Sequence, residues 1–325
     1  MHRIALIGAG RIGRIHARNA ALNDRLTLAG IVDPMADSAA SLAAEWNAPV
    51  LSLDEAMNDP SIAGVIIASS TDTHLDYSIR AARAGKAIFC EKPIDQDLDR
   101  ARSGAADLAD ARMLLAFNRR FDPNFQALKA RLDSGQVGGL ESLQITSNDP
   151  SPPPPSYVAV SGGLFKDMAI HDFDMARWLL GEEPVEVYAA GSCLVDPEIG
   201  KLGDVDTART VLKTASGKLC VISNSRRSGF GYDQRIEAYG SGGMVRADNV
   251  LESTVQVWTE TGAAPDRFQN FFLERYAEAY RREMTHFADM LDGAKASVGY
   301  ADGVAALALA EAAAESVKSG RVVRL

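Results

Sequence analysis

The sequence has little cysteine and no excess of positive charge. Its 325 residues include only three cysteines, Cys90, Cys193 and Cys220, and these form no CxxC pair. This excludes a disulfide-stapled scaffold, provides no metal-site spacing, and favours a reducing compartment, for which we expect the cytoplasm. The formal net charge of −9 argues against nucleic acid or an acidic membrane surface as a partner.

Long apolar runs are also missing. No uncharged stretch is long enough to cross a bilayer, so we expect no membrane partner. A short strand pattern and a glycine turn follow Arg3, where a signal peptide would carry an apolar segment and a cleavage site. The length exceeds that of one ordinary core and favours two domains.

The first third alternates short β-rich runs with amphipathic helical patterns such as 12–22, 73–84 and 97–109. This alternation predicts βαβ units and a doubly wound parallel sheet of the Rossmann type. The predicted strands are Ile4–Ile7, Leu26–Val32, Val50–Ser52, Gly64–Ala68, Ala87–Cys90 and Met113–Phe117.

The pattern changes near Asn118, so we predict a Rossmann domain at 1–119 and a second α/β domain at 120–325. Short strands with glycine turns, the last of them at 254–259, predict a mostly antiparallel sheet there, followed by helices at 273–291 and 301–318. Four consecutive prolines, 152–155, form either a plain linker or a stiff loop that walls a cleft.

The segment Gly8-Ala9-Gly10-Arg11-Ile12-Gly13 lies between a predicted strand and a predicted helix. In this context a GxGxxG loop binds a dinucleotide, with Gly8, Gly10, Arg11 and Ile12 beside the pyrophosphate. Asp33 ends the second strand, where an acid accepts hydrogen bonds from the adenosine ribose. No Lys or Arg occurs between Arg25 and Arg80 to neutralise a 2′-phosphate, so we expect NAD rather than NADP.

Polar residues follow the next strand at the ligand-binding edge of such a sheet. We expect Ser69, Thr71 and His74 to line the cofactor groove, while His74 could instead lie on the helix surface. Thr71 or Asp72 is also expected to cap the following helix.

Glu91-Lys92-Pro93 ends a further strand at the same edge, and both Glu91 and Lys92 are expected near the cofactor. The proline restricts Lys92 to an extended conformation and so directs its side chain. A lysine at a strand end is usually a solvated cation; this position favours a functional role.

Asp167, His171, Asp174 and Trp178 recur at helical spacing and form one stripe. Leu164, Met168, Met175 and Leu179 form an apolar stripe beside it. A histidine next to a carboxylate can exchange protons at neutral pH. The alternative is a structural His–Asp pair, and the dinucleotide loop upstream favours catalysis.

These motifs resemble those of the glucose–fructose oxidoreductase, inositol dehydrogenase and rhizopine catabolism family over the whole chain. The resemblance rests on the glycine loop, on Glu91-Lys92-Pro93 and on Asp167-x-x-x-His171. Segments 117–122, 149–153, 162–167, 231–235 and 272–276 resemble those of its members that act on myo-inositol.

The resemblance implies a Rossmann domain followed by a domain with an open-faced sheet that pairs subunits, commonly into a homotetramer. It also implies that Lys92, Asp167 and His171 are catalytic, and that myo-inositol is oxidised to 2-keto-myo-inositol with NAD. By analogy, Arg120, Asp149, Tyr232 and Tyr280 would lie around the substrate; the choice of Arg120 over Arg119 is arbitrary.

Two alternatives stay open at this point. The chain could act on another cyclic polyol or sugar, such as scyllo-inositol or an aldose, because the trio is shared within the family. It could also be an NAD-bound sensor without turnover, although members of that kind typically lose the lysine or the histidine. Neither the oxidised hydroxyl nor the first proton acceptor follows from the sequence.

Overall fold

The computed structural model describes all residues, 1–325, and they form two compact units. The first unit consists of Met1–Phe121 and Ala279–Leu307, and the second of Asp122–Glu278 and Ala308–Leu325. The first matches the predicted Rossmann domain in character, and the second carries the larger sheet.

The first unit includes a return of the chain, 279–307, that a single boundary between 119 and 120 does not provide for. Segment 279–307 packs within the first unit because helix α12 (Ala277–Leu291) presents apolar side chains to the parallel sheet. The ring of Phe287 lies 5.7 Å from that of Phe89. This contact was not visible in the local sequence pattern.

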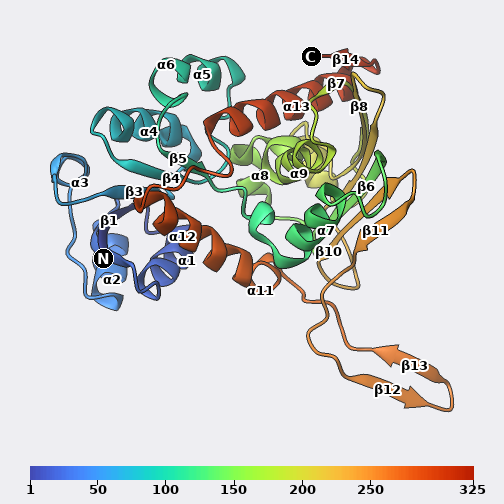
Figure 1. Ribbon diagram of the computed structural model, residues 1–325, viewed down its shortest axis with the longest axis horizontal. Helices are drawn as coiled ribbons and strands as arrows, with labels where there is room; N and C mark the ends of the chain where they lie inside the picture. The colour runs from blue at the N-terminus through green and yellow to red at the C-terminus, as the bar shows by residue number, and fades with distance from the viewer. The chain divides into compact units, whose positions relative to one another are not determined.

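A five-stranded parallel sheet forms the core of the first unit, in the order β2-β1-β3-β4-β5 (Figure 1). Its strands are almost wholly buried, as expected for a sheet covered on both faces. The predicted Rossmann fold class is therefore confirmed. The strands are β1 (His2–Ile7), β2 (Leu26–Val32), β3 (Gly64–Ile67), β4 (Ala87–Cys90) and β5 (Met113–Leu115).

Helices join these strands as predicted, with two differences. The predicted strand at Val50 is only an isolated bridge to Ile31, because Ser52 caps a helix in a capping box with Glu55. The predicted helix 97–109 is two helices divided at Gly104. The helical elements are α1 (Arg11–Ala21), α2 (Ala36–Glu45), α3 (Leu53–Asn58), η1 (Thr71–Thr73), α4 (His74–Arg83), α5 (Leu98–Ser103), α6 (Ala105–Leu108) and η2 (Asn118–Phe121).

The second unit contains a seven-stranded sheet in the order β11-β10-β6-β9-β8-β7-β14. Only β6 and β9 run parallel, and all other neighbouring pairs are antiparallel, which confirms a mostly antiparallel sheet. Its strands are β6 (Leu140–Asn148), β7 (Pro184–Ser192), β8 (Thr207–Thr214), β9 (Leu219–Ser225), β10 (Asp233–Gly240), β11 (Gly243–Ala247) and β14 (Val323–Arg324).

One face of this sheet is covered by helices, and α9 packs against β6. The last helix, α13, ends in this unit, where the Ser316 hydroxyl accepts the N–H of Ala189 at 2.9 Å. The helical elements are α7 (Pro123–Asp133), α8 (Pro155–Ser161), η3 (Phe165–Ala169), α9 (Ile170–Leu180), α10 (Pro197–Lys201), α11 (Phe272–Arg275) and α13 (Tyr300–Ser319).

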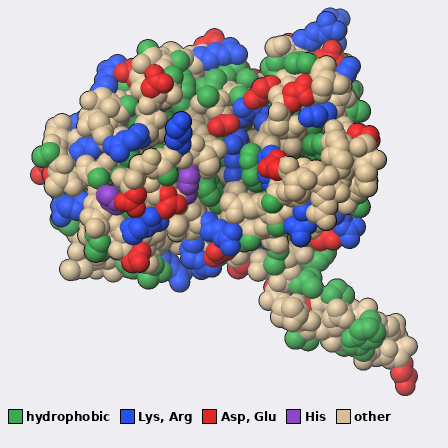
Figure 2. Space-filling model, in the orientation of Figure 1, with side chains coloured by type: hydrophobic (Ala, Val, Ile, Leu, Met, Phe, Trp, Pro, Cys, Tyr) green, Lys and Arg blue, Asp and Glu red, His purple; other side chains and the backbone are tan.

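Strands β12 (Gln256–Thr259) and β13 (Gly262–Pro265) form a separate hairpin that extends from the second unit (Figures 1 and 2). The sequence analysis predicted the first strand at 254–259 as part of the large sheet and missed the second. The hairpin has no cover on either face, and Trp258 is 74% exposed.

None of the helices combines the length and apolar character needed to cross a bilayer.

A buried carboxylate organises the turn before β8. The Asp206 carboxylate accepts the N–H groups of Leu194, Val195 and Asp196 at 2.8–2.9 Å, and the Thr207 hydroxyl also donates to it at 2.9 Å. Burial alone would raise the pKa of Asp206, but these hydrogen bonds lower it to about 2. The ionised form therefore stabilises the fold at neutral pH.

We expect Asp206→Asn to lower the free energy of unfolding at pH 7 by about 2 kcal/mol, because the pKa is depressed from 3.8 to about 2. The amide would also turn an N–H group toward backbone donors. This stabilising contribution is present above the ordinary pKa and is lost as the pH falls through the folded pKa. Unfolding curves between pH 7 and pH 3 measure it, with the exposed Glu260→Gln as control. An equal loss at both ends of that range would contradict the assignment.

Candidate active site

In the loop between β1 and α1, close packing requires glycine at two positions, whereas the space beside the remaining glycine, Gly10, is open. Gly8 has a φ of 106°, and a Cβ there would lie 2.4 Å from the Ala68 carbonyl oxygen. A Cβ on Gly13 would lie 1.9 Å from the carbonyl oxygen of Gly8. A Cβ on Gly10 would meet no atom within 4 Å. The space beside Gly10, at the N-terminus of α1, therefore fits a pyrophosphate group.

Asp33 lies just after β2 and is fixed against this loop. Its carboxylate accepts the N–H of Ala9 at 2.6 Å through one oxygen and the N–H of Met35 at 2.8 Å through the other. Each oxygen retains a lone pair for a further donor, such as a ribose hydroxyl. Arg11 is exposed and Ile12 is half-buried at the start of α1, as expected for residues beside a phosphate.

The polar loop after β3 is held by its own hydroxyl groups. The Thr73 hydroxyl donates to the carbonyl of Ser70 at 2.7 Å and lies 2.6 Å from the Ser69 hydroxyl. Thr71 and Asp72 form a 3₁₀ turn, and neither caps α4. The predicted cap is therefore wrong, because the extra turn moves the helix start beyond both residues.

His74 is buried, with 2% of its surface exposed, so it does not lie on the helix surface. Its Nδ1 is 2.8 Å from the carbonyl oxygen of Pro93, and its Nε2 is 3.1 Å from that of Ser69. The ring thereby joins the loops that follow β3 and β4. Its contact with a cofactor stays a prediction.

Glu91 fixes the backbone of Lys92 at the end of β4. One Glu91 oxygen is 2.7 Å from Nε2 of the buried His16, and the other accepts the Lys92 N–H at 3.2 Å. Burial alone would raise the pKa of Glu91, but the hydrogen bond to His16 and the nearby positive charges lower it. The Lys92–Pro93 peptide bond is cis.

A second carboxyl group, that of Glu283 on α12, lies within electrostatic reach of Glu91. Glu283 is wholly buried, and its carboxyl oxygens have no hydrogen-bond partner. Burial, together with the charge of Glu91, raises the pKa of Glu283 well above its ordinary value. Burial therefore favours the protonated form of Glu283, whereas the contacts of Glu91 favour its ionised form.

Arg120 and Tyr280 also belong to the first unit. The Arg120 guanidinium donates to Asp302 at 2.8 Å and to the carbonyl of Ser297 at 3.2 Å. The ring of Tyr280 lies 5.8 Å from that of His16. These contacts anchor both side chains within the unit, and their assignment to the substrate stays a prediction.

In the second unit, the segment that carries Asp167 and His171 is not a regular α-helix throughout. Phe165–Ala169 forms a π-helical turn, η3, and the α-helix α9 begins at Ile170. Such turns are frequent at functional sites. Four residues make slightly less than one π turn and slightly more than one α turn, so both side chains still share one side.

The apolar stripe of this segment is buried as predicted, at Leu164, Met168, Met175 and Leu179. The polar stripe was expected at the boundary between the buried and the exposed face of the helix, but it is more buried than that. Asp174 is fully buried, and His171 is half-buried. The Asp172 carboxylate accepts the Asn224 side-chain N–H at 2.8 Å and so ties α9 to β9.

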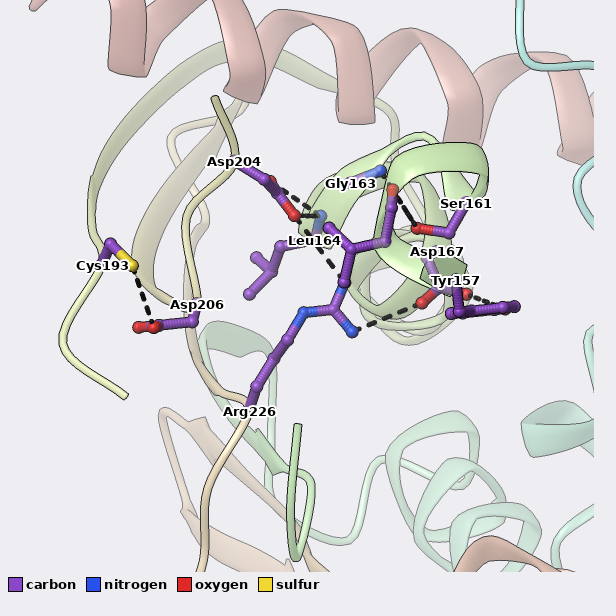
Figure 3. A network of polar contacts seen from close by, with 10 residues as sticks. Tyr157, Ser161, Gly163, Leu164, Asp167, Cys193, Asp204, Asp206 and Arg226 are labelled. Atoms are coloured by element: carbon purple, nitrogen blue, oxygen red, sulfur yellow. Dashed lines mark hydrogen bonds and ion pairs between the residues drawn. The ribbon is translucent and has the colours of Figure 1, made fainter. Parts of the chain in front are cut away.

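The Asp167 carboxylate is held from two other elements (Figure 3). The Tyr157 hydroxyl donates to its Oδ1 at 2.9 Å, and Arg226 Nη1 lies 3.4 Å from its Oδ2. Tyr157 lies on α8, which begins at Pro155, the last residue of the proline run, and Arg226 follows the end of β9. The prolines are therefore more than a plain linker, because they lead into a contact with Asp167.

Asp149 and Tyr232 lie at one edge of the seven-stranded sheet. Asp149 follows β6, and its N–H donates at 2.9 Å to the carbonyl oxygen of Ser225, the last residue of β9. Tyr232 precedes β10, whose first residue, Asp233, pairs with Asn148 at the end of β6. This edge also carries Arg226, so the fold brings these positions onto one rim.

The predicted site residues thus fall into two groups. The cofactor positions and Lys92 lie in the first unit, together with Arg120 and Tyr280. Asp167 and His171 lie in the second unit, together with Asp149 and Tyr232.

Among the residues that the sequence analysis did not single out, His16 contacts Glu91, and Tyr157 and Arg226 contact Asp167. His16 lies in α1, the helix that follows the glycine loop. Its position near that loop could have marked it as a candidate residue of the cofactor site. Arg226 follows a strand that ends at the same edge as β6, but its neighbours are remote in sequence. The chain contains no cluster of three or more His, Cys, Asp or Glu side chains suited to a metal ion.

Family models match most of the chain. Residues 2–117 match the model "Oxidoreductase family, NAD-binding Rossmann fold", and residues 125–246 match the "GFO/IDH/MocA C-terminal domain". The N-terminal match agrees with the open Gly10 position and with Asp33, and it identifies an NAD-binding domain.

Curated relatives and solved structures are similar over the full length. The chain is 45% identical to an inositol 2-dehydrogenase of Rhizobium meliloti, with 99% of each chain covered. It is 46% identical to a myo-inositol 2-dehydrogenase of Thermotoga maritima, over 99% of this chain and 98% of the relative.

Among solved structures, a myo-inositol dehydrogenase from Corynebacterium glutamicum superposes with a TM-score of 0.96 at 44% identity, covering 100% of this chain and 99% of that one. A scyllo-inositol dehydrogenase from Lactobacillus casei, with bound NAD(H) and scyllo-inositol, gives 0.90 at 28% identity over 100% and 99%.

We expect Asp33→Ser to raise the affinity for NADP relative to NAD by about tenfold or more, because the carboxylate that repels a 2′-phosphate is removed. The serine hydroxyl can still accept the N–H of Met35. Calorimetric titration with both cofactors measures the ratio, with Asp37→Ser on the exposed face of α2 as control. An unchanged ratio would show that Asp33 does not select the cofactor.

Proposed function

This chain belongs to the GFO/IDH/MocA oxidoreductase family, and we propose that it oxidises myo-inositol to 2-keto-myo-inositol with NAD. The assignment of the substrate rests on the 45–46% identity, over nearly the whole chain, to enzymes named for this reaction. The site geometry supports the chemistry, because an acid–base pair and a lysine accompany the dinucleotide loop.

Each proposed catalytic residue has a distinct task. NAD, when bound, accepts the hydride from the carbinol carbon. His171 removes the proton of the same hydroxyl, and Lys92 donates a hydrogen bond to its oxygen as the carbonyl forms. Asp167 holds His171 and Lys92 in their relative orientation, and it balances the positive charge that His171 gains.

Support for these roles lies in how firmly each backbone and side chain is held. Glu91 accepts the N–H of Lys92 and so fixes the lysine backbone at the end of β4. Tyr157 and Arg226 hold Asp167 on η3. Asp149 and Tyr232, at the edge of the large sheet, and Arg120 and Tyr280, in the first unit, are proposed to contact ring hydroxyls.

A second candidate is oxidation of another cyclic polyol. It is favoured by the relative from Lactobacillus casei, whose structure holds scyllo-inositol and NAD(H). The two substrates differ in the orientation of one hydroxyl, so the same catalytic trio would serve both.

A panel of polyols and aldoses, each with NAD and with NADP, tests the proposal by the rate of NADH or NADPH formation. We expect myo-inositol with NAD to give the highest kcat/KM. A clear preference for scyllo-inositol or an aldose would replace the substrate. Tight NAD binding without turnover of any panel member would instead indicate a sensor.

We also propose a homotetramer in the cytoplasm. The cysteines are all free, as expected for a reducing compartment. Sedimentation velocity at micromolar concentration measures the oligomer size; a monomer would contradict the proposal.

We expect His171→Ala and Lys92→Ala to lower kcat on the preferred substrate by about 10²–10⁴-fold, because each removes a proton-transfer or hydrogen-bonding group from the reacting oxygen. Steady-state kinetics measures the loss, and Lys295→Ala at an exposed position is the control. Activity within about tenfold of wild type in either variant would remove that residue from the mechanism.

A further inference from the structure

Arg226 is a cation enclosed within the second unit, with a side chain only 1% exposed. Its Nη1 lies 3.4 Å from Asp167 Oδ2, and its Nη2 lies 3.9 Å from Asp204 Oδ2 (Figure 3). A buried charge is stable only when opposite charges and hydrogen bonds compensate it. The two carboxylates supply this compensation from different segments.

Asp204 links the same guanidinium to the start of the catalytic segment. Its two carboxylate oxygens accept the N–H of Leu164 at 3.1 and 3.0 Å, immediately before η3. Gly163 permits this approach, since a Cβ there would lie 2.8 Å from Asp204 Oδ1 and its φ is +82°. Arg226 therefore faces both the start of η3 and the carboxylate that η3 carries.

The backbone of Arg226 is itself fixed. Its N–H donates to the carbonyl oxygen of Asp206 at 2.8 Å. Asp206 is held in turn by the three backbone N–H groups of 194–196. The backbone that carries the guanidinium is therefore fixed at the end of β9. The Tyr157 hydroxyl holds the other carboxylate oxygen of Asp167.

This arrangement is costly if it serves stability alone. The Nε and Nη2 groups of Arg226 are buried and make no hydrogen bond. Unsatisfied buried donors destabilise a fold, and apolar replacements of buried ion pairs are often neutral or stabilising. The retained cation therefore indicates a task beyond packing.

We propose that Arg226 is a positioning residue, which fixes the carboxylate of Asp167 in the orientation that hydride transfer needs. It acts through Asp167 and touches neither substrate nor cofactor. Its catalytic consequence rests on the proposed function, whereas its effect on the placement of Asp167 and on the neighbouring His171 does not.

Kinetics of Arg226→Met and Arg226→Lys test the catalytic consequence, with Arg227→Met at the adjacent exposed position as control. We expect Arg226→Met to lower kcat about 10²-fold with KM changed less than about threefold, since a small misplacement of a catalytic group has that effect. Arg226→Lys, which keeps the cation, should recover part of the loss. Affinity for NAD should be unchanged in all variants.

Tyr157→Phe provides a second variant that removes only one hydroxyl, from a residue that is 43% exposed, and so carries little risk for folding. We expect a severalfold loss of kcat, because Asp167 loses the donor to its Oδ1. A lower unfolding temperature in Arg226→Met with unchanged kcat, or equal losses in the Met and Lys variants, would overturn the proposal.

A measurement without substrate separates this inference from the proposed function. The chain has five histidines, so the side-chain ¹⁵N signals of His171 can be assigned by comparison with His171→Asn. We expect its titration midpoint to move to higher pH in Arg226→Met, on the order of half a pH unit, because the Asp167 carboxylate, four residues from His171, loses the guanidinium that compensates its charge. The shift should be smaller in Arg226→Lys.

The two sets of results have separate meanings. If wild type oxidises no polyol but the His171 midpoint shifts, the proposed function fails and the positioning of Asp167 stands. If wild type is active and neither kcat nor the midpoint responds to Arg226→Met, the inference fails and the function stands.

Discussion

The segment that carries Asp167 is held to the second unit by the compensation of a buried cation, Arg226. Arg226 cannot be hydrated, so carboxylates must come to it, and they come from segments that are remote in sequence. Asp204 fixes the start of η3, and Asp167 is carried by η3 itself. The position on the sheet of the segment that carries Asp167 and His171 is therefore an electrostatic requirement as well as a packing preference.

The first unit contains a buried anion, Glu91, whose charge also has to be compensated. Glu91 remains ionised because His16 contacts one of its oxygens and the Lys92 N–H donates to the other. The Glu283 carboxyl group has no hydrogen-bond partner, and its burial and the charge of Glu91 raise its pKa. The Glu91 carboxylate thereby links the buried His16 to the Lys92 backbone at the end of β4.

Local patterns predicted most of the fold, because strand burial and helix periodicity are encoded within a few residues. They failed where distant contacts decide: the return of 279–307 to the first unit, and the hairpin formed by β12 and β13. The glycine loop and Asp33 were found because their spacing is itself the motif. Arg226 was not, since 59 residues separate it from Asp167 and only the sheet brings them together.

If Lys92 and His171 act on one hydroxyl, as proposed, the precision of the site has to be built separately into two units. Each unit contains its own means of doing so: a carboxylate that holds the backbone of Lys92, and a guanidinium that holds Asp167. Neither arrangement requires the substrate. Because both sets of groups are oriented beforehand, less of the binding energy is needed to order side chains.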